Sequence, residues 1–214
     1  EDNKNNGMQA MAVAPVDSNG KVDTSKVVIA YAGTGEFIDG IMDIYHVIGG
    51  FNGAWGQIDT SEKFADKIKK EYPNSTIDFT GHSLGGYLAV HNAARNKSKA
   101  TVFNAPDASN SLTKEQIEDV LKNPGMIKNY RNPRDKIGNY GGDKLGIAIY
   151  VDSDVKPYLM PLDALISIYH AINSWKNFDK DGNLLDKNGK IAREVELKEL
   201  DIDGDGKIAV SYTH

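Results

Sequence analysis

The stretch "DFTGHSLGGYLAVHNAAR", residues 78–95, places the pattern Gly-x-Ser-x-Gly around Ser83. The residues "STIDFT", 75–80, are rich in β-branched and aromatic side chains and predict a short buried strand. Beyond the glycines, apolar residues recur at helical spacing, so we expect a helix that starts at Leu84. The predicted order is strand, sharp turn, helix, and a serine on such a turn is strained and aims its hydroxyl out of the sheet.

Two interpretations of this turn compete. A glycine-rich turn between a strand and a helix can contain an ordinary serine. The flanking strand and helix favour a nucleophile, because the helix N-terminus beneath Ser83 offers free N–H groups and a positive dipole end to a developing oxyanion. On this interpretation the backbone N–H of Leu84 is one oxyanion donor, and the rest of the chain must supply a base and an orienting acid.

The composition bounds the class of protein. The chain has 214 residues, enough for one α/β domain, with 40% hydrophobic and 26% charged residues, as in ordinary globular proteins. A net charge of −5 without a basic stripe argues against a nucleic-acid partner, and no apolar run reaches the roughly 18 residues of a membrane span. Cysteine is absent, which excludes disulfides, cysteine catalysis and thiolate metal sites. Because the sequence starts at Glu1, we expect a mature or trimmed product.

Strands and helices alternate along the chain, which predicts an α/β fold with a mostly parallel sheet and flanking helices. The further strands are expected at 8–16 and 26–33, paired as a hairpin, and at 99–106, 126–131 and 146–151. The further helices are expected at 60–73 behind a Ser/Thr cap, at 112–125 behind Thr113, and at 161–175. We expect residues 1–177 to form the α/β domain, and 178–214 to form a short Asp/Gly-rich β-hairpin extension packed on it.

Chain order selects the candidate base. In a hydrolase built on this turn, the serine comes first, the acid second and the histidine last. The chain has five histidines. His46 and His82 precede the serine, His91 lies two turns along the same helix, and His214 ends the chain. His170 remains as the candidate base, although a histidine satisfied in the core would also fit.

The acid and the second oxyanion donor are expected in loops that follow strands. The candidate acids are Asp107, Asp135, Asp143 and Asp152. Asp135 suits the role best, because it lies just past a strand end in a Pro-containing loop, and Asp107 is the runner-up. The backbone N–H of Thr34, after the strand at 26–33, is the candidate second donor, unless Gly-Thr-Gly there is a plain β-turn.

With these pieces placed, the chain resembles the class 3 lipases, the α/β-hydrolase group that includes fungal triacylglycerol lipases and plant phospholipases A1. The resemblance is to their bacterial lipase-like, phospholipase A1-like branch, and it runs from about Gly7 to Trp175. It places the oxyanion role of "AYAGT" on Thr34, the nucleophile of "TGHSLGG" on Ser83, the acid of "NYRNPRDKIG" on Asp135 and the base of "SIYHAINSW" on His170.

The chain departs from the family in two respects, while a segment at the position of the family's lid is present. Asn104 of "TVFNAP" stands where the family has glycine, and the disulfides of the fungal relatives are missing. Residues 37–55 lie where the family keeps its lid, and they are apolar enough to cover a site or touch lipid. A packed loop and helix at 37–55 is an equal alternative.

The resemblance implies a serine hydrolase that cleaves carboxylic esters of acyl lipids through an acyl-enzyme and requires no cofactor. It favours phospholipid or lysophospholipid substrates, peripheral membrane contact and secretion from a bacterial cell. A flanking domain or a neutralising protein partner would lie outside this chain. The alternatives are an esterase or thioesterase for soluble acyl substrates, and a non-catalytic scaffold that binds a partner.

The tail contains a candidate structural calcium site. Its ligands would occupy positions 1, 3 and 5 of an EF-hand-like loop, with a glycine at position 6: Asp201, Asp203, Asp205 and Gly206. Position 12 is Tyr212 rather than the bidentate glutamate, and a similar run begins at Asp179. Because Asp-Gly runs also form turns between strands, the loop has a simpler interpretation.

Overall fold

The computed structural model describes residues 6–33, 53–135, 137–142 and 144–150, and then 169–172, 175, 177–181, 183–185, 188–191 and 194–195. Most of the candidate lid at 37–55 and most of the expected helix at 161–175 therefore lie outside the described residues.

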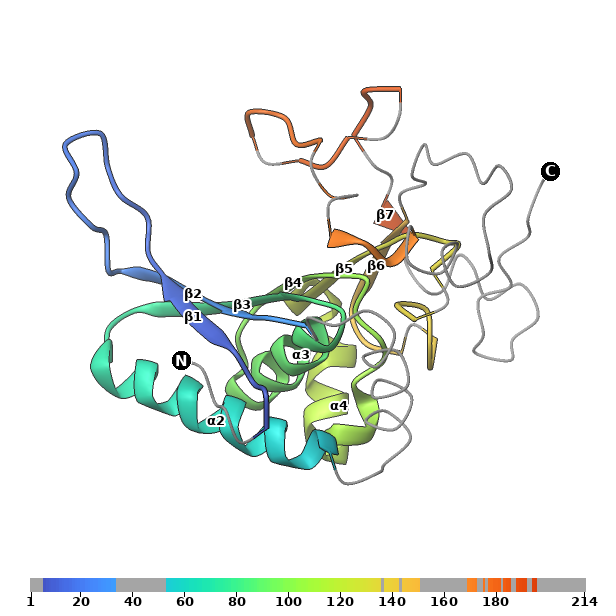
Figure 1. The fold of residues 1–214 in the computed structure, drawn as a ribbon, viewed down its shortest axis with the longest axis horizontal. Coiled ribbons are helices and arrows are strands. Elements are labelled where there is room, and N and C mark those ends of the chain that lie inside the picture. The colour runs from blue at the N-terminus through green and yellow to red at the C-terminus, as the bar shows by residue number, and fades with distance from the viewer. Residues whose placement is uncertain are drawn as a thin grey trace.

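One sheet of seven strands runs through the described part of the chain, and its spatial order follows the chain order (Figure 1). The strands are β1 (Ala10–Val13), β2 (Lys26–Tyr31), β3 (Thr76–His82), β4 (Ala100–Phe103), β5 (Ile127–Arg131), β6 (Ile147–Tyr150) and β7 (Glu194–Val195). Strands β2 to β6 are parallel, whereas β1 and β7 pair antiparallel at the two edges. The expected hairpin and the mostly parallel sheet are both confirmed.

The α-helices in the described part of the chain lie on one face of the sheet (Figure 1). They are α2 (Gly53–Glu71), α3 (Leu84–Asn96) and α4 (Lys114–Lys122). Because the strand order advances in one direction and parallel crossovers are right-handed, each connecting helix returns to the same face. Helix α3 is central and buried from its first residue through Ala94, as expected of a helix that is apolar on most sides.

The opposite face of the sheet has its own apolar cluster over β4 to β6. Phe103 and Tyr130 lie side by side on it, with ring centroids 5.4 Å apart, and Ile149 continues the row. The buried side chains of Trp175 and Leu184 cover this row, with the Trp175 ring 5.8 Å from that of Phe103. C-terminal segments thus pack against the sheet, while the division of the chain at residue 178 stays a prediction.

The start of α2 was predicted wrongly. The Ser/Thr pair was expected to cap a helix at Thr60, but the helix begins at Gly53. Both hydroxyls instead bond backward inside the helix, from Thr60 to the Gly56 carbonyl at 2.8 Å and from Ser61 to that of Ile58 at 2.7 Å. The first turns contain Gly53 and Gly56, which have poor helix propensity and interrupt the apolar periodicity, so the sequence pattern does not predict a helix there.

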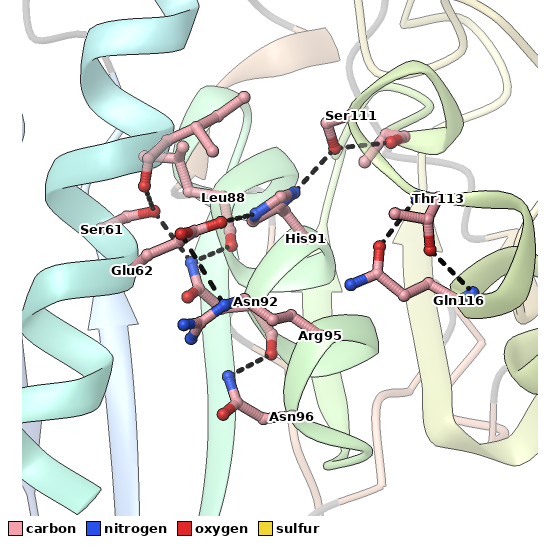
Figure 2. Close-up of polar contacts among 12 residues, drawn as sticks. Ser61, Glu62, Leu88, His91, Asn92, Arg95, Asn96, Ser111, Thr113 and Gln116 are labelled. Atoms are coloured by element: carbon pink, nitrogen blue, oxygen red, sulfur yellow. Dashed lines mark hydrogen bonds and ion pairs between the residues drawn. The ribbon is translucent and has the colours of Figure 1, made fainter.

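Helix α4 begins behind Thr113, the predicted cap, and the structure adds that this cap is a capping box with Gln116 (Figure 2). The Thr113 hydroxyl accepts from the Gln116 backbone N–H, and the Gln116 side chain accepts from the Thr113 N–H at 2.8 Å.

Thr113→Ala removes this cap and should lower the free energy of unfolding by about 1 kcal/mol, whereas Thr113→Ser keeps the hydroxyl and should stay near the wild type. Urea denaturation of the three proteins measures the difference. Equal midpoints for the alanine and serine variants would contradict the expectation.

Candidate active site

Ser83 occupies a strained turn between β3 and α3. Its φ of 56° and ψ of −127° are unusual for a residue other than glycine. The turn is fixed on both sides, because the Ser83 N–H donates to the Phe103 carbonyl at 3.0 Å and the Ser83 carbonyl accepts from the Tyr87 N–H at 3.0 Å. The adjacent strand and the first turn of the helix therefore hold the conformation that points the hydroxyl toward its partners.

The glycines of the motif allow the backbones to approach closely. A Cβ on Gly81 would lie 2.3 Å from the carbonyl carbon of Gly85, and a Cβ on Gly85 would lie 2.2 Å from the carbonyl oxygen of Tyr31. The contacting atoms are backbone and cannot rotate away. Glycine is therefore required where α3 crosses β2 and β3.

Three buried side chains form a hydrogen-bonded chain that starts at this turn. The distance from His170 Nε2 to Ser83 Oγ is 2.7 Å, and from His170 Nδ1 to Asp135 Oδ2 it is also 2.7 Å. The serine lies before α3, the aspartate lies in the loop after β5, and the histidine lies in the described segment 169–172. The structure thus brings together the residues that chain order and resemblance selected.

The alternative acids do not share this arrangement. The carboxylate of Asp107 accepts from the Ser109 hydroxyl at 2.5 Å and pairs with Lys144 at 3.4 Å. It serves a turn and a surface ion pair, while His170 bonds to Asp135. The other two candidates, Asp143 and Asp152, lie outside the described residues.

The loop that carries Asp135 is tied internally. The Asp135 side chain is fully buried, and its second oxygen accepts from the Ile137 N–H at 3.0 Å. The Asn139 amide donates to the Asp135 carbonyl at 2.6 Å, and the buried Arg131 guanidinium donates to the Gly138 carbonyl at 2.5 Å. These bonds leave the carboxylate one fixed orientation, which suits a group that holds an imidazole in place.

The oxyanion side is described only in part. Leu84 is the first residue of α3, so its N–H belongs to the amides that have no partner inside the helix. Thr34 lies outside the described residues. The oxyanion roles of Leu84 and Thr34 therefore stay predictions.

The candidate calcium loop at 201–206 also lies outside the described residues. Its relative at Asp179 forms a turn, in which the Asp179 carboxylate accepts from the backbone N–H groups of Asp181 at 2.9 Å and Asn183 at 2.8 Å. That geometry is an Asx-turn, the simpler interpretation of such runs.

His82 is a residue of the site that chain order excluded as a base and that sequence reasoning left without a role. Its Nε2 lies 2.5 Å from the carbonyl oxygen of His170, and the two rings are 4.8 Å apart. Because a carbonyl only accepts, Nε2 carries the proton. Burial, and then the charge of His170, lower the pKa of His82 to about 4, so the ring is neutral near neutral pH.

This lowered pKa predicts an acid-sensitive fold. As the pH falls below 6.5, the unfolded chain takes up the His82 proton first, so stability falls until the pH reaches about 4. Between about pH 7.5 and about pH 4.5, His82 should account for a loss of roughly 2–3 kcal/mol.

Urea denaturation of wild type and His82→Gln at both pH values isolates this loss, because glutamine does not titrate. The wild type should lose more stability on acidification than the variant does. Equal losses in the two proteins would contradict the expectation.

A second serine–histidine–carboxylate contact lies away from this site (Figure 2). His91 bridges Glu62 at 2.8 Å and Ser111 at 3.0 Å, which joins α2 and α3 to the short helix η1 (Ser109–Ser111). The Ser111 hydroxyl donates to the Ala108 carbonyl at 2.8 Å and sits on no strained turn. This contact fastens the helices and lacks the geometry of a nucleophile.

The structure has counterparts among solved lipases. Lipase II from Rhizopus niveus is 14% identical with a TM-score of 0.50, and the match covers 72% of this chain and 65% of that one. The lipase from Rhizopus microsporus var. chinensis is 15% identical with a TM-score of 0.48, covering 72% of this chain and 61% of that one. The chain therefore spans less than two thirds of the length of these two lipases. The likeness to the Rhizopus niveus enzyme concerns the fold alone, and it confirms the predicted α/β-hydrolase architecture.

A family model identifies the chain more closely than the fold does. The phospholipase-like model, described as a Tle-like phospholipase domain, matches residues 1–143, which is more than half of the chain. The protein belongs to this phospholipase-like family, in agreement with the resemblance that the motifs carry. A search among curated proteins finds no match. In the described part of the chain, no helix is long and apolar enough to cross a bilayer.

Proposed function

We propose that the protein is a serine hydrolase that cleaves carboxylic esters of acyl lipids. The observation that carries the proposal is the hydrogen-bonded chain from Ser83 through His170 to Asp135, built on a strained turn at the carboxyl end of a parallel strand. Membership of the phospholipase-like family supports both the enzyme class and the lipid substrate.

In the proposed reaction, Asp135 accepts the Nδ1–H of His170, which leaves Nε2 free to accept the Ser83 proton. The Ser83 oxygen attacks the ester carbonyl, and the N–H of Leu84, with that of Thr34, binds the oxyanion. His170 then gives the proton to the leaving alcohol, and the acyl group stays on Ser83. A water that His170 deprotonates attacks this acyl-enzyme, and His170 returns the proton to the Ser83 oxygen as the bond to the acyl group breaks and the fatty acid leaves.

Phospholipid or lysophospholipid is the proposed substrate, and the family model supports this choice over triacylglycerol. Secretion from a bacterial cell, peripheral membrane contact, and a flanking domain or neutralising partner remain predictions from the resemblance. Calcium binding at Asp201, Asp203 and Asp205 remains a prediction from the sequence. Its role would be structural, because the Ser83 chemistry needs no metal.

Fatty-acid release tests the proposal. Phospholipid vesicles, a triacylglycerol emulsion and a soluble short-chain ester are each incubated with wild type and Ser83→Ala, with and without EDTA. We expect Ser83-dependent release that is fastest from phospholipid, and a loss with EDTA only if calcium supports the fold. Release from the soluble ester alone would select the soluble esterase, and no release from any substrate would select the non-catalytic scaffold.

A further inference from the structure

Asn104 follows β4 and is fully buried, with a φ of 45°. Both polar atoms of its side-chain amide form hydrogen bonds. Oδ1 accepts from the Asn132 N–H at 2.9 Å, and Nδ2 donates to the Tyr169 carbonyl at 3.0 Å. The side chain therefore connects the loop after β5, which carries the candidate acid, to the residue immediately before the candidate base.

The next carbonyl along the chain is held in the same way. His82, at the end of β3, donates from Nε2 to the His170 carbonyl at 2.5 Å. His82 pairs with Phe103 in the parallel register of β3 and β4, so His82 and Asn104 come from adjacent strand ends. Two side chains from the carboxyl edge of the sheet thus bind two consecutive carbonyls of the segment that carries the imidazole.

We propose that Asn104 and His82 are positioning residues that hold the backbone of His170, so that its ring reaches Ser83 and Asp135 together. The inference rests on the proposed serine hydrolase and adds the residues on which its base depends. Two hydrogen bonds of 2.7 Å on opposite sides of one ring leave little freedom in its placement. The ring can meet both partners only if the backbone beneath it is fixed.

Glycine, the residue of the class 3 pattern at this position, fits a φ of 45° without strain but has no amide to offer. Asparagine is among the residues that tolerate this region best, and it adds the two hydrogen bonds. A Cβ on Gly138 would lie 2.8 Å from the Asn104 Cα and 2.6 Å from Asp135 Oδ2, so the backbone of Gly138 packs closely against both Asn104 and the acid. Asparagine here fixes the loops that carry the acid and the base relative to each other.

The decisive variant is Asn104→Gly, which keeps the backbone conformation and deletes both amide bonds. The matched control is Lys97→Gly. Lys97 caps the C-terminal end of α3 with a φ of 54°, so it also fits glycine, and it lies at the opposite end of that helix from Ser83. In Asn104→Gly we expect His170 to be displaced, so kcat should fall by about 10–100-fold with KM unchanged. The rate at which a fluorophosphonate labels Ser83 should fall by the same factor. Lys97→Gly should keep wild-type values of both.

The His82 half of the proposal is tested by rescue. His82→Leu removes the donor and should lower kcat in the same manner, whereas His82→Gln keeps an N–H group and should restore most of the loss. Equal kcat values for the leucine and glutamine variants would overturn the role of His82.

A readout that needs no activity separates this inference from the proposed function. The Nδ1–H of His170, bonded to Asp135, should give a low-field proton resonance, assigned by its loss in His170→Ala. We expect it to broaden or shift in Asn104→Gly and to stay unchanged in Lys97→Gly. Wild-type kinetics and resonance in Asn104→Gly would overturn the inference, as would a loss of activity that only follows a loss of folded protein. If the wild type hydrolyses no ester while the resonance still responds to Asn104, the proposed function fails and the positioning role stands.

Discussion

Replacing Ser83 with alanine should reduce ester hydrolysis by about 10⁵–10⁶-fold, because the variant loses the nucleophile and no other group can form the acyl-enzyme. Ser83→Gly should be equally inactive. The two variants should differ in stability, since Ser83 holds a φ of 56°, which is costly for alanine and free for glycine. The glycine variant should therefore unfold at a higher urea concentration than the alanine variant.

Initial rates on the preferred ester and urea denaturation of the three proteins measure both effects. Activity of Ser83→Ala within tenfold of the wild type would contradict the role of the nucleophile. Equal denaturation midpoints for the alanine and glycine variants would contradict the strain at this turn.

Gly85→Ala should have the largest effect on stability. The added methyl would lie 2.2 Å from the Tyr31 carbonyl oxygen and 2.7 Å from the Ala32 carbonyl carbon, so α3 would have to move away from β2. A clash with backbone at the centre of the core belongs to the exceptional class of substitutions, which cost more than about 4 kcal/mol. The same movement would displace Ser83, which lies two residues before the glycine.

The matched control is Gly125→Ala, because nothing lies within 4 Å of a Cβ at that glycine. It should change the free energy of unfolding by no more than about 0.5 kcal/mol, as exposed substitutions usually do. The folded fraction and the denaturation midpoint of the two alanine variants give the comparison. A Gly85→Ala protein as stable as Gly125→Ala would show that the close crossing does not limit the fold.

The features that could be predicted from the sequence depend on local pattern or on chain order. The turn at Ser83 is marked by the glycines that its crossing needs, and the Thr113 cap is marked by Gln116 three residues later. His170 was selected because the order of residues on this fold leaves few alternatives, and it does lie between Ser83 and Asp135.

The features that could not be predicted depend on contacts between distant residues. His82 reaches the carbonyl of a residue 88 positions away, and Asn104 reaches one 65 positions away. The departure from glycine at Asn104 was visible in the sequence, but the partners of its amide were not. The early start of α2 was missed for a different reason, because glycine weakens the helical pattern in the first turns.

The most direct test of the central claim is covalent labelling with a fluorophosphonate, followed by mass mapping of the modified peptide. We expect a single adduct on Ser83 that forms rapidly in the wild type and slowly in His170→Ala, because the imidazole must take the serine proton. No adduct on the folded wild-type protein, or an adduct on another serine such as Ser111, would show that Ser83 is not the activated nucleophile.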